Sequence, residues 1–132
     1  MTPPVITALY AGLAALIFLW LTWAVVQHRR SGKIVHGDGG DKVVAKSIQG
    51  HANATEQMPM ILIMLGLTEM LGAPAIAVHI AGIAFILGRL PHGLHFNGHI
   101  GFWARPGGMV LTLTTSGVLA LGLIAHAISQ MG

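Results

Sequence analysis

An uncharged stretch near the amino terminus constrains this fold more than any other feature of the chain. Residues 5–26 contain no Asp, Glu, Lys or Arg. As a helix rising 1.5 Å per residue, the stretch would be about 33 Å long, which matches a bilayer core of about 30 Å. We do not interpret it as a signal peptide, because no basic residue precedes it and residues 28–30 place His-Arg-Arg directly after it. The stretch predicts a membrane helix with Trp20 and Trp23 as interfacial anchors.

The rest of the chain is also poorly suited to a water-exposed surface. Of the 132 residues, 54% are hydrophobic and only 8% are charged, whereas soluble domains carry roughly 25% charged residues. The length fits one domain, and the lack of cysteine excludes disulfide and thiol chemistry by the chain itself. The net charge of +3 rests on few charged residues, so we expect no nucleic-acid partner. The composition predicts a single integral membrane domain.

Three further segments predict helices. Asp41 can cap a helix over residues 42–71, in which a short apolar part lies between Glu56 and Glu69. Pro residues can open the two helices that follow. We predict an all-α, homotrimeric four-helix membrane bundle; a weaker interpretation has three spans, with the second segment on the membrane surface. The predicted spans are residues 4–27, 42–71, 74–92 and 106–130.

The third predicted helix ends near residue 92, because several helix-breaking residues follow one another there. His92, His95 and His99 are three and four residues apart, which would line one face of a continuous helix and could hold zinc or nickel. Since we expect no continuous helix, we interpret this segment as a histidine-rich loop with no metal site. The breaking residues are Pro91, Gly93, Asn97 and Gly98.

The basic residues indicate the orientation in the membrane. Five of the seven fall between the first two predicted spans, and Arg89 and Arg105 flank the connection between the last two. The positive-inside rule therefore predicts that both long connections are cytoplasmic and both termini extracytoplasmic. We expect the functional site at the cytoplasmic side. The five clustered residues are Arg29, Arg30, Lys33, Lys42 and Lys46.

A few polar side chains within the predicted helices are candidates for function. An ionisable group inside a membrane helix costs at least about 2.5–3.5 kcal/mol, so it is seldom kept without a role. Asn53 and Glu56 are three residues apart and share a helix face, and Arg89 and His92 repeat that spacing. A Glu56–Arg89 pair could lock two helices together. The same charges could instead bind the ammonium and carboxylate of a zwitterionic peptide. His51 and Arg105 are the remaining candidates, because they lie in the same part of the chain as these residues.

The same residues resemble the signatures of one family, the membrane-associated proteins in eicosanoid and glutathione metabolism (MAPEG). Residues 51–59, His51-Ala-Asn53-Ala-Thr-Glu56-Gln-Met-Pro59, are similar to the family's second-helix pattern R-x-H-x-N-x-x-E-x-x-P. Residues 69–74 resemble the turn common in bacterial members, and residues 88–92, Gly88-Arg89-Leu-Pro-His92, resemble the third-helix stretch G-R-x-x-H. Arg105 lies where active members carry an arginine that opens the fourth helix. The resemblance covers essentially the whole chain.

The resemblance implies a homotrimer that binds glutathione as co-substrate between neighbouring subunits. Arg105 would be the catalytic residue that holds the glutathione sulfur as a thiolate, which is the nucleophile toward a hydrophobic electrophile in the membrane. The other implied binding residues are Asn53, Glu56, Arg89, His92, His51 and Arg30.

Three hypotheses for function follow. The leading one is a membrane-bound glutathione-dependent transferase or peroxidase, which Arg105 favours. The alternative is a non-catalytic lipid-binding or scaffold member of the same fold. It is favoured by Gln49, where the family pattern has arginine, and by Phe96, where a tyrosine is common. A weaker alternative is a metal or ion carrier that uses the histidines. The expected partners are further copies of the chain, membrane lipid and a hydrophobic small molecule.

Overall fold

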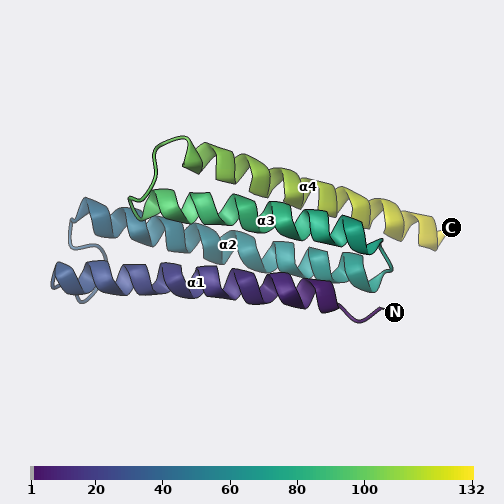
Figure 1. The fold of residues 1–132 in the computed structure, drawn as a ribbon, viewed down its shortest axis with the longest axis horizontal. Helices are drawn as coiled ribbons and strands as arrows, with labels where there is room; N and C mark the ends of the chain where they lie inside the picture. The colour runs from purple at the N-terminus through teal and green to yellow at the C-terminus, as the bar shows by residue number, and fades with distance from the viewer. Residues whose placement is uncertain (1) are drawn as a thin grey trace.

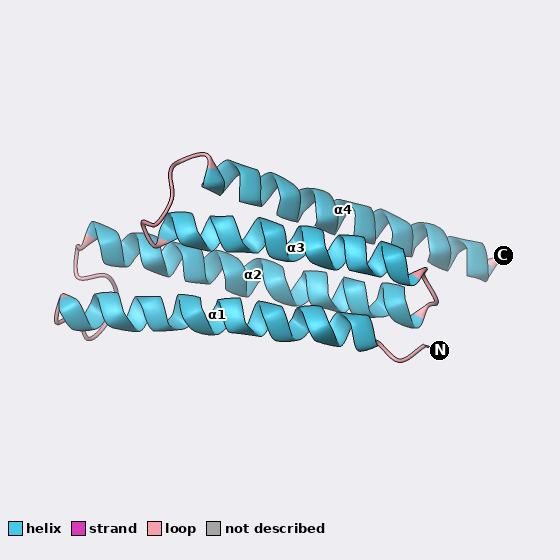
Figure 2. Ribbon diagram, viewed as in Figure 1, coloured by secondary structure: helices cyan, strands magenta, loops and turns pink. Residues whose placement is uncertain are grey.

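The computed structural model describes residues 2–132, which form four long helices (Figure 1). Every regular element in that part of the chain is a helix (Figure 2), so the all-α four-helix prediction is confirmed. Successive helices alternate in direction. Both termini and the turn at residues 71–74 therefore lie at one end of the bundle, here called the terminal end. Residues 32–41 and 97–103 form the opposite, loop end. The helices are α1 (Val5–Ser31), α2 (Lys42–Met70), α3 (Ala75–Phe96) and α4 (Ala104–Met131).

Each helix buries one stripe of side chains and exposes large aliphatic residues on its other faces. The buried positions of α1 recur every three or four residues, which is the spacing of one helix face. Leu16, Ile80 and Leu121 are 65%, 62% and 70% exposed. Such broad apolar surfaces are unfavourable in water but suit the hydrocarbon of a bilayer. The buried residues of α1 are Thr7, Tyr10, Ala14, Ile17, Leu21 and Val25.

Three of the four helices, α1, α3 and α4, are long and apolar enough to cross a membrane. The exception is α2, whose first half is polar. This helix has 29 residues, which corresponds to about 44 Å, and it lies beside the other helices along its length (Figure 1). The structure thus shows three candidate spans. That α2 crosses the membrane with them stays a prediction, which its length and position support.

The predicted end of the third helix near residue 92 is wrong. Pro91 lies inside α3, which continues to Phe96. Neighbouring helices can compensate the backbone hydrogen bond that a proline removes, so proline is tolerated in membrane helices. The side-chain amide of Asn97 then donates to the carbonyl oxygen of Gly93 (3.0 Å) at the end of the helix. The uninterrupted helix keeps His92 on its buried face.

A pair of glycines lets α3 and α4 approach closely. A Cβ atom on Gly88 would lie 2.8 Å from Oγ1 of Thr112 and 3.0 Å from the carbonyl oxygen of Gly108. A Cβ atom on Gly108 would lie 3.0 Å from Cβ of His92. Small residues at membrane-helix contacts permit such close backbone packing. This contact places the first turns of α4 directly beside the polar end of α3.

Glu69 fastens α1 to α2 at the terminal end. Its buried carboxylate accepts hydrogen bonds from the backbone N–H groups of Ile6 (2.8 Å) and Thr7 (2.7 Å). N–H groups in the first turn of a helix have no partner within it, and the helix dipole favours a negative charge there. Pro4 provides no side-chain cap for α1, so a residue more than sixty positions away performs that role. The sequence alone does not predict this role, because Glu69 marks only the border of an apolar stretch there.

We expect Glu69→Ala to lower the free energy of unfolding by about 3 kcal/mol or more. Each of the two hydrogen bonds to this carboxylate contributes about 1.5–3 kcal/mol, because the acceptor is charged. The measurement is denaturation of the detergent-solubilised protein followed by circular dichroism. Asp38→Asn, an exposed acid-to-amide change at the loop end, is the control and should leave stability unchanged. Equal stability of the two variants would contradict the role assigned to Glu69.

Candidate functional site

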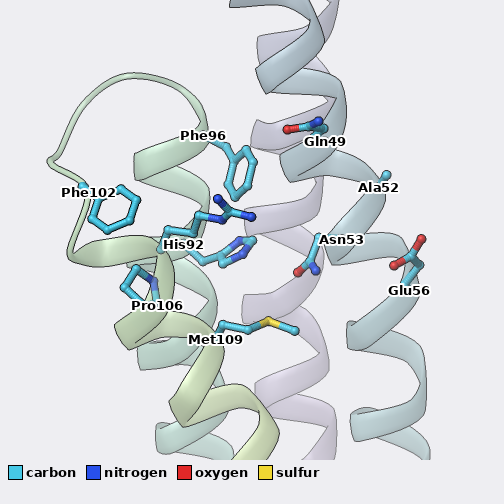
Figure 3. A pocket seen from close by; sticks show the side chains of 10 residues that line it. Gln49, Ala52, Asn53, Glu56, His92, Phe96, Phe102, Pro106 and Met109 are labelled. Carbon is cyan, nitrogen blue, oxygen red and sulfur yellow. The ribbon is translucent and has the colours of Figure 1, made fainter.

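A cavity of about 560 Å³ opens near the loop end between α2, α3 and α4. Figure 3 shows the side chains that line it, which come from these three helices and, for Phe102, from the loop before α4. One wall is polar, and Phe102 and Met109 add an apolar wall. The remaining lining residues are Gln49, Ala52, Asn53, Glu56, His92, Phe96, Arg105 and Pro106.

Four of the seven predicted site residues meet in this cavity. Asn53 and Glu56 come from α2, His92 from α3 and Arg105 from the first turn of α4. They are far apart in the sequence, and the close packing of α3 on α4 brings the last two together. The structure therefore places these side chains around one space large enough for a small molecule. Their roles in binding and catalysis stay predictions.

Arg89 lies behind the cavity rather than in its wall. Its side chain is only 2% exposed. Nε donates to Oγ1 of Thr112 (3.2 Å), and Nη1 donates to Oδ1 of Asn53 (2.7 Å). Nη2 is buried and has no hydrogen-bond partner. Arg89 therefore links α2 to α4 through α3 and fixes the position of Asn53 at the cavity wall.

The Glu56–Arg89 pair, one of the two alternatives for these charges, is not formed. Glu56 is exposed and points away from His92 (Figure 3). No ion pair to Arg89 is present among residues 2–132; its side-chain partners are Asn53 and Thr112. The physical reason is the rotation of α2, which turns Asn53 toward α3 and leaves Glu56 on the outer side. The carboxylate of Glu56 is thus available to a ligand or to another subunit.

Phe96 positions two of the predicted site residues. The guanidinium carbon of Arg105 lies 5.7 Å from the centroid of the Phe96 ring, which is within the range of a cation–π contact. The His92 ring lies against the same phenyl ring, with centroids 4.8 Å apart. Phe96 in turn packs on Gly50, where a Cβ atom would lie 2.6 Å from Cβ of Phe96. Any larger residue at position 50 would require Phe96 or the α2 backbone to shift.

From the sequence alone, Phe96 differs from the family pattern only by the missing hydroxyl group of a tyrosine, and its role beside His92 and Arg105 is not predicted. The four-residue spacing between His92 and Phe96 places both on one helix face. That signal was available, but the predicted helix end near residue 92 concealed it.

Two predicted residues lie elsewhere. His51 faces α1, where its Nε2 lies 3.1 Å from Oγ1 of Thr22 and its ring contacts Phe18 with centroids 4.9 Å apart. Arg30 is exposed near the end of α1. Neither residue lines the cavity within one chain.

The histidines of the loop end do not converge. His92 lies against Phe96, Nδ1 of His95 lies 3.0 Å from the carbonyl oxygen of Gly101, and the His99 ring lies 6.5 Å from that of Trp20. Residues 2–132 contain no group of three His, Cys, Asp or Glu side chains placed to hold a metal ion. The metal-carrier hypothesis therefore has no ligand set in the described chain.

Comparison with known sequences agrees with this architecture. The sequence profile of the MAPEG family matches residues 7–125. The chain is 36% identical over 102 residues to inner membrane protein YecN of Escherichia coli strain K12, and the match covers 77% of this chain and 78% of YecN. YecN of Escherichia coli O6:H1 strain CFT073 gives the same values, and no solved structure matches significantly. The chain is therefore a membrane protein, and it belongs to the MAPEG family.

We expect Asn53→Ala to destabilise the protein by about 1.5–3 kcal/mol, because it leaves Nη1 of the buried Arg89 without its partner. In an Arg89→Leu background the same change should cost far less, since no buried charge is then left unpaired. The wild-type protein, the two single variants and the double variant are denatured in the same detergent. Their free energies of unfolding give the coupling energy between Asn53 and Arg89. Thr55→Ala, at an exposed position of the same helix, is the control. A cost of Asn53→Ala that is independent of Arg89 would show that the hydrogen bond is unimportant.

Proposed function

We propose that the protein is a membrane-bound, glutathione-dependent transferase or peroxidase that acts on hydrophobic electrophiles. The observation that carries the proposal is the position of Arg105. Its exposed guanidinium projects into the cavity, rests on Phe96 and forms no hydrogen bond to any of residues 2–132. A cation that is held in place but has no anionic partner is suited to bind an anion.

The chemistry of a thiol fits this cation. A fixed positive charge nearby lowers the pKa of a thiol, and the thiolate is the reactive nucleophile. With an alkylating electrophile, the sulfur forms a bond to carbon and the leaving group departs with its electron pair. With an organic hydroperoxide, two glutathione molecules are oxidised to the disulfide while the hydroperoxide is reduced to an alcohol and water. Arg105 takes the same part in both reactions.

The other lining residues match the remaining parts of the two substrates. Glu56 offers an unpaired carboxylate to the ammonium group of glutathione, and Asn53 offers an amide that Arg89 holds in place. Phe102 and Met109 form an apolar wall of the same cavity, which suits a hydrophobic electrophile. The polar and apolar parts of the cavity thus correspond to a peptide thiol and a lipid-soluble partner.

We also propose that the working unit is a homotrimer with this cavity at the cytoplasmic side. Glu56 is exposed on α2 in the single chain, and a carboxylate facing lipid is unfavourable. A neighbouring subunit packed on this face would remove that cost and would complete the cavity. The basic residues at the loop end support the cytoplasmic location.

A second candidate is a non-catalytic, lipid-binding scaffold of the same fold. Two lining residues favour it. Gln49 stands where the family pattern has an arginine, so Arg105 is the one basic lining residue besides the buried His92. Phe96 brings no hydroxyl group to the wall. The variants of Arg105 described below distinguish the two functions.

Reporter fusions test the orientation. Alkaline phosphatase fused after Gly132 should be active, because an even number of crossings returns the carboxyl terminus to the extracytoplasmic side. The same reporter inserted after Gly39, in the loop between α1 and α2, should be inactive and serves as the matched control. A cytoplasmic carboxyl terminus together with an extracytoplasmic amino terminus would mean that α2 lies on the membrane surface.

Arg105→Ala should abolish conjugation of a model electrophile but leave glutathione binding largely intact, because the charged groups of the peptide are held elsewhere. Arg105→Lys should restore part of the rate, since it keeps the charge but not the planar guanidinium. Glu56→Gln should mainly weaken binding, by the equivalent of about 2–5 kcal/mol for a buried charged contact. Ultraviolet absorbance of bound thiolate, equilibrium binding and initial rates give the three readouts.

Particle mass in detergent must accompany each of these measurements. The wild-type protein and every variant should contain three copies per particle, which shows that a lost rate is not lost assembly. If the intact trimer neither binds glutathione nor forms a thiolate, the enzyme hypothesis is wrong and the scaffold remains. If Arg105→Ala retains the full rate, another residue activates the thiol.

A further inference from the structure

A second cavity at the loop end, of about 200 Å³, lies between α1 and α2 and shares no lining residue with the cavity of the proposed function. It is on the side of α2 that faces α1, whereas the larger cavity is on the side that faces α3 and α4. Its walls are Thr22, Val25, Val26 and Arg29 from α1, and Ile48 and His51 from α2.

From the loop end toward the middle of the bundle, the walls change from Arg29 to Val25, Val26 and Ile48, and then to Thr22 and His51. Val25, Val26 and Ile48 form the apolar part, and Arg29 follows Val25 by one helical turn. Oγ1 of Thr22 donates to the carbonyl oxygen of Phe18 and lies 3.1 Å from Nε2 of His51, so the hydroxyl group of Thr22 is hydrogen-bonded within the bundle. The order from Arg29 to the three aliphatic residues matches a phospholipid, in which the acyl chains lie deeper in the membrane and the phosphate lies nearer to water.

Arg29 is held in a position to bind an anion. Its Nε donates to the carbonyl oxygen of Gly37 (3.0 Å). Gly37 has a positive φ of 63°, a conformation that glycine adopts readily. The two terminal nitrogens of the guanidinium form no hydrogen bond to any of residues 2–132. They are therefore free to bind two phosphate oxygens at once.

The acidic residues of the same loop are occupied by backbone groups. Asp41 accepts hydrogen bonds from the N–H groups of Val43 (2.8 Å) and Val44 (3.1 Å), and Asp38 accepts one from Gly40 (2.9 Å). Residues 29–46 contain five basic and two acidic side chains, so this segment alone carries +3, the net charge of the whole chain. Clusters of basic residues next to a membrane helix attract anionic lipid headgroups.

We propose that the cavity between α1 and α2 binds one anionic phospholipid. The phosphate lies on the guanidinium of Arg29, and the first part of an acyl chain lies along Val25, Val26 and Ile48. Trp23, 55% exposed on the neighbouring face of α1, is at the depth where tryptophan meets the membrane interface. A free phosphate ion would use only the Arg29 end of the cavity and would leave its apolar walls unfilled. The site is independent of the thiol chemistry, so either proposal can fail alone.

Native mass spectrometry of the protein in detergent tests the proposal. With phosphatidylglycerol and phosphatidylcholine of identical acyl chains, we expect one phosphatidylglycerol per chain and at least tenfold weaker retention of phosphatidylcholine. Arg29→Gln should reduce phosphatidylglycerol retention at least tenfold, and Arg29→Lys should restore part of it. Lys33→Gln, which removes the same charge four residues further along the chain, should have little effect. Val26→Trp, which fills the apolar half without changing the charge, should also reduce retention.

Three outcomes would overturn the proposal. Equal losses in Arg29→Gln and Lys33→Gln would indicate only a diffuse basic surface. If inorganic phosphate displaces phosphatidylglycerol when both are at the same concentration, the cavity is an anion site that does not recognise lipid. Because the chain has no cysteine, Val26→Cys forms a disulfide only where two copies meet; such a disulfide in the native trimer would show that another subunit covers the cavity. Unfolding curves equal to that of the wild-type protein establish that each variant is folded.

Discussion

Arg89 places a positive charge in the interior of the bundle, and the arrangement of three helices depends on how this charge is satisfied. Asn53 of α2 and Thr112 of α4 accept its hydrogen bonds, so the guanidinium joins helices that are distant in the sequence. The close approach of Gly88 and Gly108 makes this geometry possible, because a Cβ atom on either residue would meet the facing helix. A buried charge of this kind penalises alternative packings, since any shift of α2 or α4 would leave more of its donors unpaired.

The two ends of the bundle differ in a way that suits their roles. At the terminal end, the carboxylate of Glu69 is fully engaged by the first turn of α1, so its charge is used for stability. At the loop end, the guanidinium groups of Arg29 and Arg105 keep free donors beside two separate cavities on opposite sides of α2. Both proposed binding sites therefore use cations that are unpaired within the described chain, whereas the paired charge of Glu69 joins two helices.

Much of the candidate site could be predicted from single residues, but their arrangement could not. Asn53, His92 and Arg105 meet in one cavity, as their positions in the halves of α2, α3 and α4 nearer to the loop end indicated. A Glu56–Arg89 pair was one of two interpretations of these charges, but the rotation of α2 presents Asn53 to Arg89 instead. The contribution of Phe96 depends on α3 continuing through Pro91. That continuation depends on support from neighbouring helices, which no local pattern contains.

The sequence by itself determined that the chain is a helical membrane protein with its basic residues at one end. Long uncharged stretches and three-to-four-residue spacings are local properties, and hydrophobic burial acts on them wherever the helices lie. Only the tertiary structure decided which carboxylate is buried, Glu69 rather than Glu56, and which polar groups share a cavity. Those outcomes depend on how each helix is rotated about its axis and how closely it approaches its neighbours. Both are determined by contacts between residues far apart in the chain, such as Gly88 with Gly108 and Ile6 with Glu69.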